Sequence, residues 1–281
     1  MHKTLFLQLN STQQTQVMGV VNTTPDSFFD GGHYNAVEKI APHIRALVDH
    51  GADILDIGAE SSRPGARSVS EQEEIERLAP ALEIAGDTGC PFSVDTCKST
   101  VARYAIEHGA IMVNDITAFR NDPNMGELVA EKQVLCVLMH MLGTPQTMQI
   151  NPHYEDVVQE VYDFLEERVA YALSKGIRED HIWIDPGFGF GKTVKQNLML
   201  LRNLDVFARL GRPILLGTSN KSTIGAVLGL DAQERLEGTA ATVAFAINKG
   251  VHCVRVHDVK AMKRVAHMCD AILGNYDETF D

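Results

Sequence analysis

One segment of the chain combines a carboxylate, two aromatic rings and a run of glycines. Residues 182–192 read IWIDPGFGFGK, in which a short apolar run ends in Asp185 and alternating glycine and phenylalanine follow. A carboxylate can accept hydrogen bonds from the edge of a flat polar ring, and Phe188 and Phe190 can line its face. Glycines let the backbone approach such a ring closely. The segment therefore predicts a pocket for a flat ring with polar edges.

The end of the same segment imitates a phosphate-binding loop. Lys192 and Thr193 match the last residues of a GxxxxGKT motif, whose backbone cradles the phosphates of a nucleotide. The first glycine of that motif falls on Pro186. We therefore exclude a nucleotide-triphosphate site, and Lys192 is left without a predicted role.

Polar side chains also follow the other short apolar runs of the chain. These residues are Asn22, Ser62 with Arg63, Asp95, Asn114 with Asp115, His140, Ser219 with Lys221, and Arg255 with His257. One group of residues suits a heterocycle with an amino-pyrimidinone edge: Asp95, Asn114, Asp185 and Lys221. Carboxylate and amide oxygens accept from ring N–H groups, and an ammonium donates to a ring carbonyl. Each residue alone could cap the helix that follows it, but the four together favour a binding pocket.

A second group suits an oxyanion: Asn22, Arg63, Arg255 and His257. Arginine can hold an oxyanion through two parallel hydrogen bonds, and histidine can add a donor. The amide oxygen of Asn22 is a hard ligand that suits Mg²⁺ together with a diphosphate and several waters. No cysteine or histidine cluster has the spacing of a zinc site, which argues against a metal-hydrolase barrel.

These residues end strands that alternate with helices along the whole chain. The predicted strands cover residues 17–21, 54–57, 92–94, 111–113, 134–139, 182–184, 214–216 and 253–256. The predicted helices cover residues 36–49, 71–86, 99–108, 124–132, 154–175, 195–209, 234–248 and 259–272. Eight strand–helix units in roughly 250 residues predict an α/β fold, a closed (β/α)₈ TIM barrel. Residues 4–16 are expected to add a short N-terminal β-hairpin.

An open, doubly wound sheet is the alternative fold. Such a sheet gathers its ligand contacts at one or two loops, near the point where the strand order reverses. Here polar residues follow all eight predicted strands, and a barrel brings all eight carboxyl ends to one face. Their spread therefore favours the barrel and predicts an enzyme with its site at that face.

The composition narrows the class of protein. The chain has 281 residues, of which 44% are hydrophobic, and no linker or low-complexity segment divides it, so we expect one domain over residues 1–281. A net charge of −12 argues against a nucleic-acid partner. No apolar run has membrane length, no signal peptide is evident, and the five cysteines form no CxxC pair. These features predict a soluble, cytoplasmic protein with no membrane partner.

Three loops have unusual compositions. Residues 22–32 read NTTPDSFFDGG and residues 60–66 read ESSRPGA, and their Gly and Pro residues could let both close over a site. Ordinary strand–helix connections are the alternative for these two loops. Residues 217–225 read GTSNKSTIG and lead from a strand into a helix. The backbone N–H groups near Ser222 are therefore expected to hold a carboxylate.

Taken in order, these segments resemble the dihydropteroate synthase family, whose members bind pterins. The matching segments are MGVVNTTPDSFFDGG, GAESSRPGA, SVDTCKS, NDI, LMHMLGTPQTMQ, DPGFGFGK, GTSNKS and VRVHDV, which span about residues 17–259. Eight motifs in the expected order are far more specific than any one of them. The resemblance implies a (β/α)₈ barrel that acts in folate biosynthesis. It implies condensation of 4-aminobenzoate with (7,8-dihydropterin-6-yl)methyl diphosphate to give 7,8-dihydropteroate and diphosphate.

The resemblance also implies roles position by position. For the pterin it implies contacts from Asp95, Asn114, Met139, Asp185, Phe190, Lys221 and Arg255. For 4-aminobenzoate it implies contacts from Phe28, Ser62, Pro64, Phe188, Lys221 and Ser222. For the diphosphate it implies contacts from Asn22, Arg63, Arg255 and His257, with Asn22 as the Mg²⁺ ligand. A homodimer and competitive inhibition by sulfonamides follow from the same resemblance.

The expected reaction is an SN1-like loss of Mg²⁺-bound diphosphate, which leaves positive charge on the exocyclic methylene of the pterin. Cations and Mg²⁺ therefore belong at one end of the site and carboxylates at the other. We place Asp30 and Asp185 at the carboxylate end, and Lys221 and Arg255 complete the predicted catalytic set. An arylamine nucleophile needs no obvious general base.

The sequence departs from the family mostly on the 4-aminobenzoate side. Asn220 replaces an arginine, Ser62 stands where threonine is commoner, and Phe29 stands where serine is usual. The affinity for 4-aminobenzoate and the response to sulfonamides are therefore left open. Two other functions are weighed. A pterin-dependent methyltransferase would not need the segments NTTPDSFFDGG and SNKST, and a non-catalytic pterin-binding paralogue is favoured only by Asn220 and Phe29.

Overall fold

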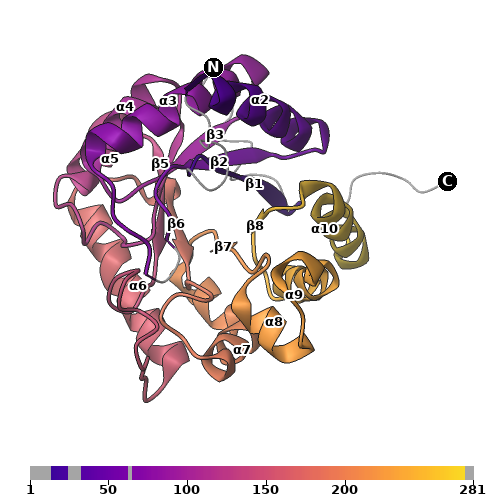
Figure 1. Ribbon diagram of the computed structural model, residues 1–281. Coiled ribbons are helices and arrows are strands. Elements are labelled where there is room, and N and C mark those ends of the chain that lie inside the picture. The colour runs from indigo at the N-terminus through magenta and orange to yellow at the C-terminus, as the bar shows by residue number, and fades with distance from the viewer. Residues whose placement is uncertain (1–13, 25–32, 63–64, 276–281) are drawn as a thin grey trace.

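Eight parallel strands form the centre of the molecule, and helices surround them (Figure 1). The computed structural model describes residues 14–24, 33–62 and 65–275, and of residues 33–37 it describes the backbone alone. The strands are β1 (Gln16–Asn22), β2 (Ile54–Gly58), β3 (Phe92–Asp95), β4 (Met112–Asp115), β5 (Leu135–Met139), β6 (Ile182–Asp185), β7 (Leu215–Leu216) and β8 (Cys253–Val256). Each strand lies where the apolar runs predict it.

A helix follows every strand. The helices are α2 (His33–Asp49), α3 (Glu71–Thr88), α4 (Ser99–Glu107), α5 (Met125–Lys132), α6 (Val157–Ser174), α7 (Val194–Arg202), α8 (Ser222–Leu228), α9 (Leu236–Asn248) and α10 (Val259–Leu273). Three short 3-10 helices are η2 (Glu179–His181), η3 (Leu204–Leu210) and η4 (Ala232–Glu234). The predicted helix over residues 195–209 is wrong in extent. It ends at Arg202, where Asn203 turns its side chain back onto the carbonyl of Met199 at 2.8 Å, and η3 follows.

The strands close into a barrel. Their order is β6-β5-β4-β3-β2-β1-β8-β7, and every neighbouring pair is parallel. A bridge between Ile184 and Ile214 joins β6 to β7, and the backbone N–H of Ile184 donates to the carbonyl of Pro213 at 3.0 Å. The predicted (β/α)₈ barrel is confirmed, and the doubly wound sheet is excluded. Residues 4–13 of the predicted N-terminal hairpin lie outside the described residues.

Successive side chains of each strand point alternately out toward the helices and into the barrel, which divides the core into two layers. Outward-facing side chains pack with the helices in one large buried cluster. A separate buried cluster fills the barrel and contains Met18, Ile54, Ile111, Met112, Leu135, Val137, Trp183, Leu215 and Cys253. Since strand residues alternate between faces, the residue two positions further along a strand faces the interior again, nearer the carboxyl end. Those next positions are Asp56, Asn114, Met139, Asp185 and Arg255. The apolar cluster is therefore the floor beneath a mostly polar layer.

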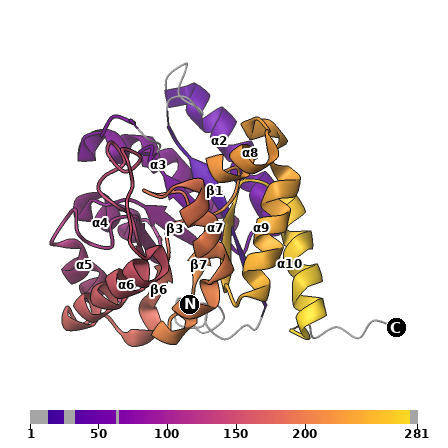
Figure 2. The same cartoon turned by 90° about the horizontal axis from the view of Figure 1, so that it is seen from below.

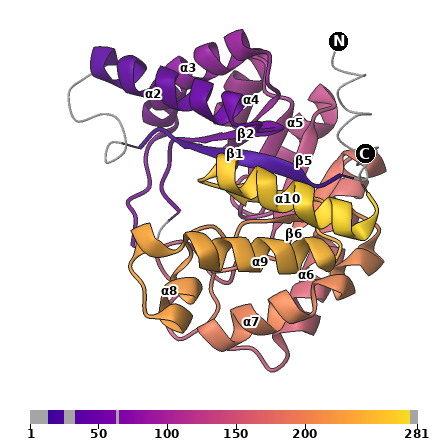
Figure 3. The same cartoon turned by 90° about the vertical axis from the view of Figure 1, so that its right-hand side faces the viewer.

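The last helices lie together on one side of the barrel. Figure 3 shows α9 and α10 side by side, and α10 also packs against β1. The short helix α8 follows the carboxyl end of β7 and lies at one end of the barrel (Figure 2). None of the described helices combines the length and hydropathy needed to span a bilayer.

Candidate active site

At the carboxyl ends of the strands, Arg255 holds two carboxylates from neighbouring strands. Its Nε donates to Asp56 Oδ2 at 2.6 Å, and its Nη2 donates to Asp95 Oδ2 at 2.8 Å. Asp56 is fully buried, whereas the side chains of Arg255 and Asp95 are partly exposed. A buried charge is costly to leave unpaired, so these contacts fix the guanidinium across β8, β2 and β3. Within the described part of the chain, no acceptor bonds to the remaining nitrogen, Nη1.

Asp56 was not predicted as a site residue, yet it organises this layer. Its Oδ2 also accepts from the Asn114 amide nitrogen at 3.1 Å, and its Oδ1 accepts from the Ser93 hydroxyl at 2.5 Å. An ionised carboxylate can only accept, so the Asn114 amide must turn its Nδ2 to Asp56 and keep Oδ1 as an acceptor for a ligand. One signal in the sequence could have revealed Asp56, because a carboxylate inside the apolar strand ILDIG needs a buried partner.

Asp185 lies in the same layer at the end of β6, where it is almost fully buried. Its Oδ1 accepts from the backbone N–H of Gly187 at 2.7 Å, and no described protein donor bonds to its Oδ2. Burial raises the pKa of Asp185 to about 6, while the Gly187 N–H and Lys221 oppose that rise. Burial, together with the nearby Asp56, raises the pKa of Asp95 to about 7 against the effect of Arg255. The two predicted pterin carboxylates therefore titrate near neutral pH.

Lys221 reaches the site from the loop after β7. Its Nζ lies 4.0 Å from the centre of the Phe190 ring, which is a cation–π contact. Burial lowers the pKa of Lys221 to about 8, Arg255 adds to the effect, and Asp185 and Asp95 oppose it. Phe190 also packs against an apolar wall formed by Ile116, Met139, Met141 and Met148. The structure therefore brings the predicted pterin residues Met139, Phe190 and Lys221 together.

Phe188 and His140 also follow strands of the barrel, but both side chains are buried away from this site. Phe188, predicted beside 4-aminobenzoate, is 2% exposed and belongs to the outer cluster between strands and helices. The glycines on either side of it, Gly187 and Gly189, have φ angles of 70° and 86°, which direct the two phenylalanine rings differently. His140 follows β5 but is buried, with its ring edge-on to Phe164 at 4.8 Å between centroids. Phe188 therefore lies in the outer cluster in this structure, and its contact with 4-aminobenzoate stays a prediction.

A hollow of about 900 Å³ opens beside the polar layer. It meets that layer at Asp95 and extends over the loops that follow β2, β3, β4 and β5. Its walls include Ser62, Thr96, Lys98, Ile116, Arg120, Met141 and Gln146. Asn114, Asp185, Lys221 and Arg255 do not line it. The hollow is therefore the mouth of the site, and it opens onto the polar layer at Asp95.

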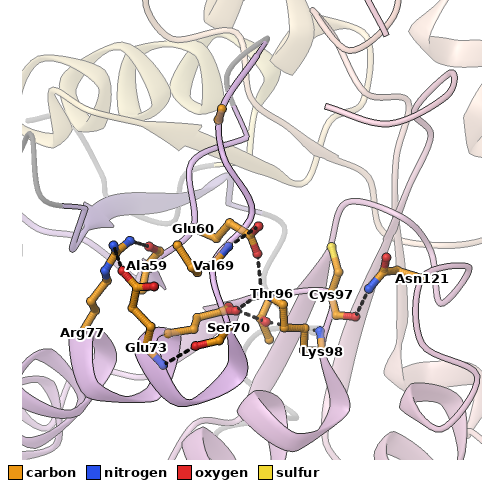
Figure 4. A network of polar contacts seen from close by, with 12 residues as sticks. Ala59, Glu60, Val69, Ser70, Glu73, Arg77, Thr96, Cys97, Lys98 and Asn121 are labelled. Atoms are coloured by element: carbon orange, nitrogen blue, oxygen red, sulfur yellow. Dashed lines mark hydrogen bonds and ion pairs between the residues drawn. The ribbon is translucent and has the colours of Figure 1, made fainter. Parts of the chain in front are cut away.

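One carboxylate anchors both ends of the loop after β2 (Figure 4). Glu60 Oε1 accepts from the backbone N–H of Val69 at 3.3 Å, and Glu60 Oε2 pairs with Lys98 Nζ at 2.5 Å. Lys98 Nζ also pairs at 2.5 Å with Glu74, a fully buried carboxylate that accepts from the Thr96 hydroxyl at 2.6 Å. Burial raises the pKa of Glu74, and the contact with Lys98 opposes the rise. Because Thr96 directly follows β3, this network ties the loop to the rim of the site.

Three of the four residues predicted for a diphosphate lie around β1 and β8: Asn22, Arg255 and His257. Asn22 ends β1 beside Gly58 of β2 and is partly buried. His257 follows β8, and its Nδ1 contacts the Ser219 hydroxyl at 2.9 Å. Arg255 lies on β8 opposite Met18 of β1, and its guanidinium reaches the carboxylates of β2 and β3. Among the residues that the structure describes, no three His, Cys, Asp or Glu side chains gather as a metal site.

The remaining predicted site residues belong to the segments that follow β1, β2 and β7. Ser62 lines the hollow, and Ser222 is the exposed first residue of α8. Asn220 has a φ of 56°, a left-handed conformation that asparagine tolerates better than arginine. Its presence here therefore suits the local backbone. Four predicted site residues lie outside the described residues, as does Phe29: Phe28, Asp30, Arg63 and Pro64.

Known proteins resemble the chain over nearly its whole length. A family model described as pterin binding enzyme matches residues 18–257. Dihydropteroate synthase of Bacillus subtilis (strain 168) is 46% identical over 267 residues, which cover 95% of this chain and 91% of that protein.

Solved structures agree with this relationship. Dihydropteroate synthase of Xanthomonas albilineans with 4-aminobenzoic acid superimposes with a TM-score of 0.87 at 42% identity, covering 93% of this chain and 94% of that one. The Yersinia pestis dihydropteroate synthase in complex with a sulfonamide drug gives a TM-score of 0.88 at 37% identity, covering 93% and 95%. The chain therefore belongs to the pterin-binding enzyme family and, within it, to the dihydropteroate synthases, which are transferases.

Proposed function

We propose that this chain condenses 4-aminobenzoate with (7,8-dihydropterin-6-yl)methyl diphosphate, giving 7,8-dihydropteroate and diphosphate. One observation carries the proposal. Above the apolar floor of the barrel, Asp56 bonds to both Asn114 and Arg255, and Asp185 and Lys221 lie close enough to affect each other's pKa. The arrangement offers oriented acceptors, one ammonium donor and one guanidinium to a single flat ligand.

The polar layer supports recognition of the pterin edge. Asn114 Oδ1 and Asp185 Oδ2 are acceptors that no described protein donor occupies. We assign them to the ring N–H groups and the exocyclic amine, and Lys221 to the ring carbonyl. Met139 and Phe190 supply the apolar walls. A mispaired ligand would leave buried polar groups without partners, which costs about 1–3 kcal/mol for each group.

The diphosphate belongs on the side of β1 and β8. Arg255 is held by Asp56 and Asp95 with one nitrogen left to contact an anion. His257 is exposed nearby, and we assign Arg63 to the same group. The amide oxygen of Asn22 fits Mg²⁺, because this ion is usually bound by few protein oxygens together with phosphate oxygens and waters. When bound, Mg²⁺ would neutralise charge on the departing diphosphate.

The residues of the chain can separate the two charges that develop in the reaction. In the proposed step, the C–O bond between the pterin methylene and the diphosphate breaks before the amine attacks. Arg255 faces the departing anion, and the Asp185 carboxylate faces the ring that becomes positive. We assign Asp30, which lies outside the described residues, to the same role as Asp185. The amine lone pair of 4-aminobenzoate then forms the C–N bond, and its proton leaves to water.

The second substrate belongs at the mouth of the site. Ser62 lines the hollow, and Ser222 follows Lys221 directly, so a carboxylate placed there has a cation beside it. Phe28 and Pro64 are assigned to the same substrate. Sulfonamides are proposed to compete with 4-aminobenzoate at this position.

Release of diphosphate tests the proposed function. Because the cycle is completed only when the amine attacks, the purified chain should release diphosphate over many turnovers only when dihydropterin diphosphate, 4-aminobenzoate and Mg²⁺ are all present. Chelation of Mg²⁺ should stop the release, and added Mg²⁺ should restore it. A pterin-dependent methyltransferase would bind pterin and release no diphosphate, and a non-catalytic paralogue would bind without turnover. An equal rate of release over many turnovers in the absence of 4-aminobenzoate would contradict the condensation.

The pH profile of kcat/KM for dihydropterin diphosphate should be bell-shaped. Asp185 and Asp95 accept at both oxygens and carry a negative charge only when ionised, so activity should fall as the pH drops through their pKa values of about 6 and about 7. Lys221 donates most strongly when protonated, so activity should also fall as the pH rises through its pKa of about 8. Steady-state kinetics measured across this pH range define the acidic and the basic limb of the profile. A flat profile would remove these three groups from substrate binding.

Lys98→Met should weaken 4-aminobenzoate binding without affecting the pterin. The substitution removes the ion pairs of Lys98 with Glu60 and with Glu74, and Glu60 closes the loop that carries Ser62. The KM for 4-aminobenzoate should rise roughly 3- to 30-fold, which corresponds to ~0.7–2 kcal/mol. Lys175→Met, which removes an exposed pair with Glu127, is the matched control. An unchanged KM in Lys98→Met would show that the network does not position the loop.

A homodimer in the cytoplasm is part of the same proposal. Several large apolar side chains are exposed on the last helices: Val227, Leu228, Leu236, Phe245, Met268, Ile272 and Leu273. None of the five cysteines is in a disulfide, as expected in a reducing compartment. Sedimentation should give twice the chain mass of 30.9 kDa. A single species of that mass would contradict the dimer.

A further inference from the structure

A buried ammonium group holds the glycine–phenylalanine loop after β6. Lys192 is 3% exposed. Its Nζ donates to the carbonyl of Gly187 at 2.9 Å, to the carbonyl of Phe190 at 3.0 Å and to Nδ1 of His140 at 2.9 Å. The three donors of the ammonium thus meet three acceptors. The lysine that imitates a phosphate-binding motif therefore points into the protein and binds its own loop.

His140 can accept this hydrogen bond because its ring stays neutral. Burial, together with the cations Lys192 and Arg120, lowers the pKa of His140 to about 2. A neutral imidazole has one nitrogen with a free lone pair, and because the ammonium of Lys192 can only donate, that nitrogen is Nδ1. Burial also lowers the pKa of Lys192 to about 7, while the nearby Asp185 opposes this effect. When Lys192 is protonated, the contact joins an ammonium donor to a neutral imidazole acceptor, and the two groups are not repelling cations.

A second buried residue, Asn197 of α7, ties the loop to the segment that carries Lys221. Its Oδ1 accepts from the backbone N–H of Gly189 at 2.7 Å. Its Nδ2 donates to the Thr223 hydroxyl at 3.0 Å and to the carbonyl of Lys192 at 3.3 Å. Asn197 is 2% exposed, and Thr223 lies in the first turn of α8, two residues after Lys221. One amide therefore connects the loops after β6 and β7.

The loop is also pressed against the segment after β5. A Cβ atom on Gly187 would lie 1.8 Å from the carbonyl oxygen of His140, and one on Gly191 would lie 2.6 Å from Cβ of Leu142. Neither distance is possible for a side chain, so the backbone contact requires glycine at both positions. The loop cannot move closer to β5, and Lys192 prevents it from moving away.

We propose that Lys192 and Asn197 are positioning residues for the pterin pocket, an inference that rests on the proposed function. The loop they hold carries the Gly187 N–H that binds Asp185 Oδ1 and the Phe190 ring that contacts Lys221 Nζ. Displacement of the loop would therefore change both an acceptor and a donor of the pocket. Neither positioning residue touches the ligand in this arrangement.

Calorimetric titration with dihydropterin diphosphate tests the inference. Lys192→Met keeps the length of the side chain and removes all three donors. Its Kd for the ligand should be roughly 10- to 100-fold weaker than that of the unmodified chain. Asn197→Asp keeps an acceptor for the Gly189 N–H and removes the donor to the Thr223 hydroxyl and to the carbonyl of Lys192, and it should weaken binding in the same direction.

A matched control separates positioning from stability. Lys263→Met removes a partly buried ammonium that pairs with Asp53 at 2.6 Å, away from the pocket. It should lower the Tm and leave the Kd within about twofold. If a folded Lys192→Met variant also binds within about twofold of the unmodified chain, the inference is overturned. If that variant does not fold, Asn197→Asp and Lys192→Gln decide by the same criterion. Failure of the unmodified chain to bind the ligand would instead contradict the proposed function.

Discussion

Arg255→Ala is expected to lower kcat/KM for dihydropterin diphosphate by ~30- to 1000-fold, or ~2–4 kcal/mol. The substitution removes the guanidinium that faces the departing diphosphate. It also leaves Asp56 and Asp95 without their shared partner, because Arg255 bonds to both at 2.6 Å and 2.8 Å. The loss therefore combines a missing contact in the transition state with a disordered polar layer. Steady-state kinetics with saturating 4-aminobenzoate measure it.

Two variants separate these contributions. Arg255→Lys keeps a positive charge and cannot reproduce two fixed contacts, so it should recover only part of the activity. Arg103→Ala removes an exposed arginine that pairs with Glu131 and should leave the kinetics unchanged. A loss below about threefold in Arg255→Ala would remove Arg255 from the site.

Asp185→Asn should weaken binding of dihydropterin diphosphate by ~30- to 1000-fold, or ~2–4 kcal/mol. One carboxylate oxygen is already bonded to the Gly187 N–H, so the second is the acceptor left for the ligand. An amide that keeps its oxygen on Gly187 must turn its NH₂ group toward the ligand, which presents donors of its own. Two donors would then face each other. Calorimetry without 4-aminobenzoate reports this loss directly.

The control for this variant is Asp180→Asn. Asp180 lies on η2, close to Asp185 in the sequence, and pairs with exposed Arg178. The substitution changes the net charge by the same amount away from the pocket and should leave the affinity unchanged. Wild-type affinity in Asp185→Asn would exclude this residue from pterin recognition.

The fold followed from the sequence because local patterns determine it. Each short apolar run became a strand, since a strand buried on both faces needs apolar residues throughout. The polar residues that end those runs meet at one face, as the closure of a barrel requires. Asn114, Asp185 and Arg255 were therefore predictable as neighbours, although they are far apart in the chain.

The partners of these residues could not be predicted in the same way. Asp56 is an interior strand position, and only the barrel shows that its neighbours are Arg255 and Asn114. The directions of Phe188 and Phe190 depend on the positive φ angles of the intervening glycines, which a motif does not reveal. The contacts of Lys192 could not be predicted either, because its acceptors are backbone carbonyls and a histidine that follows another strand. The roles of these residues depend on which groups the fold brings together, and residue type alone does not reveal those contacts.

Formation of 7,8-dihydropteroate tests the central claim most directly. The purified chain should be incubated with dihydropterin diphosphate, 4-aminobenzoate and Mg²⁺, and the product identified by mass spectrometry. Dihydropteroate should appear in step with released diphosphate and should be absent when either substrate is omitted. If the chain binds dihydropterin diphosphate yet forms no dihydropteroate, the pocket is a pterin-binding site without synthase activity, and the proposed function is wrong.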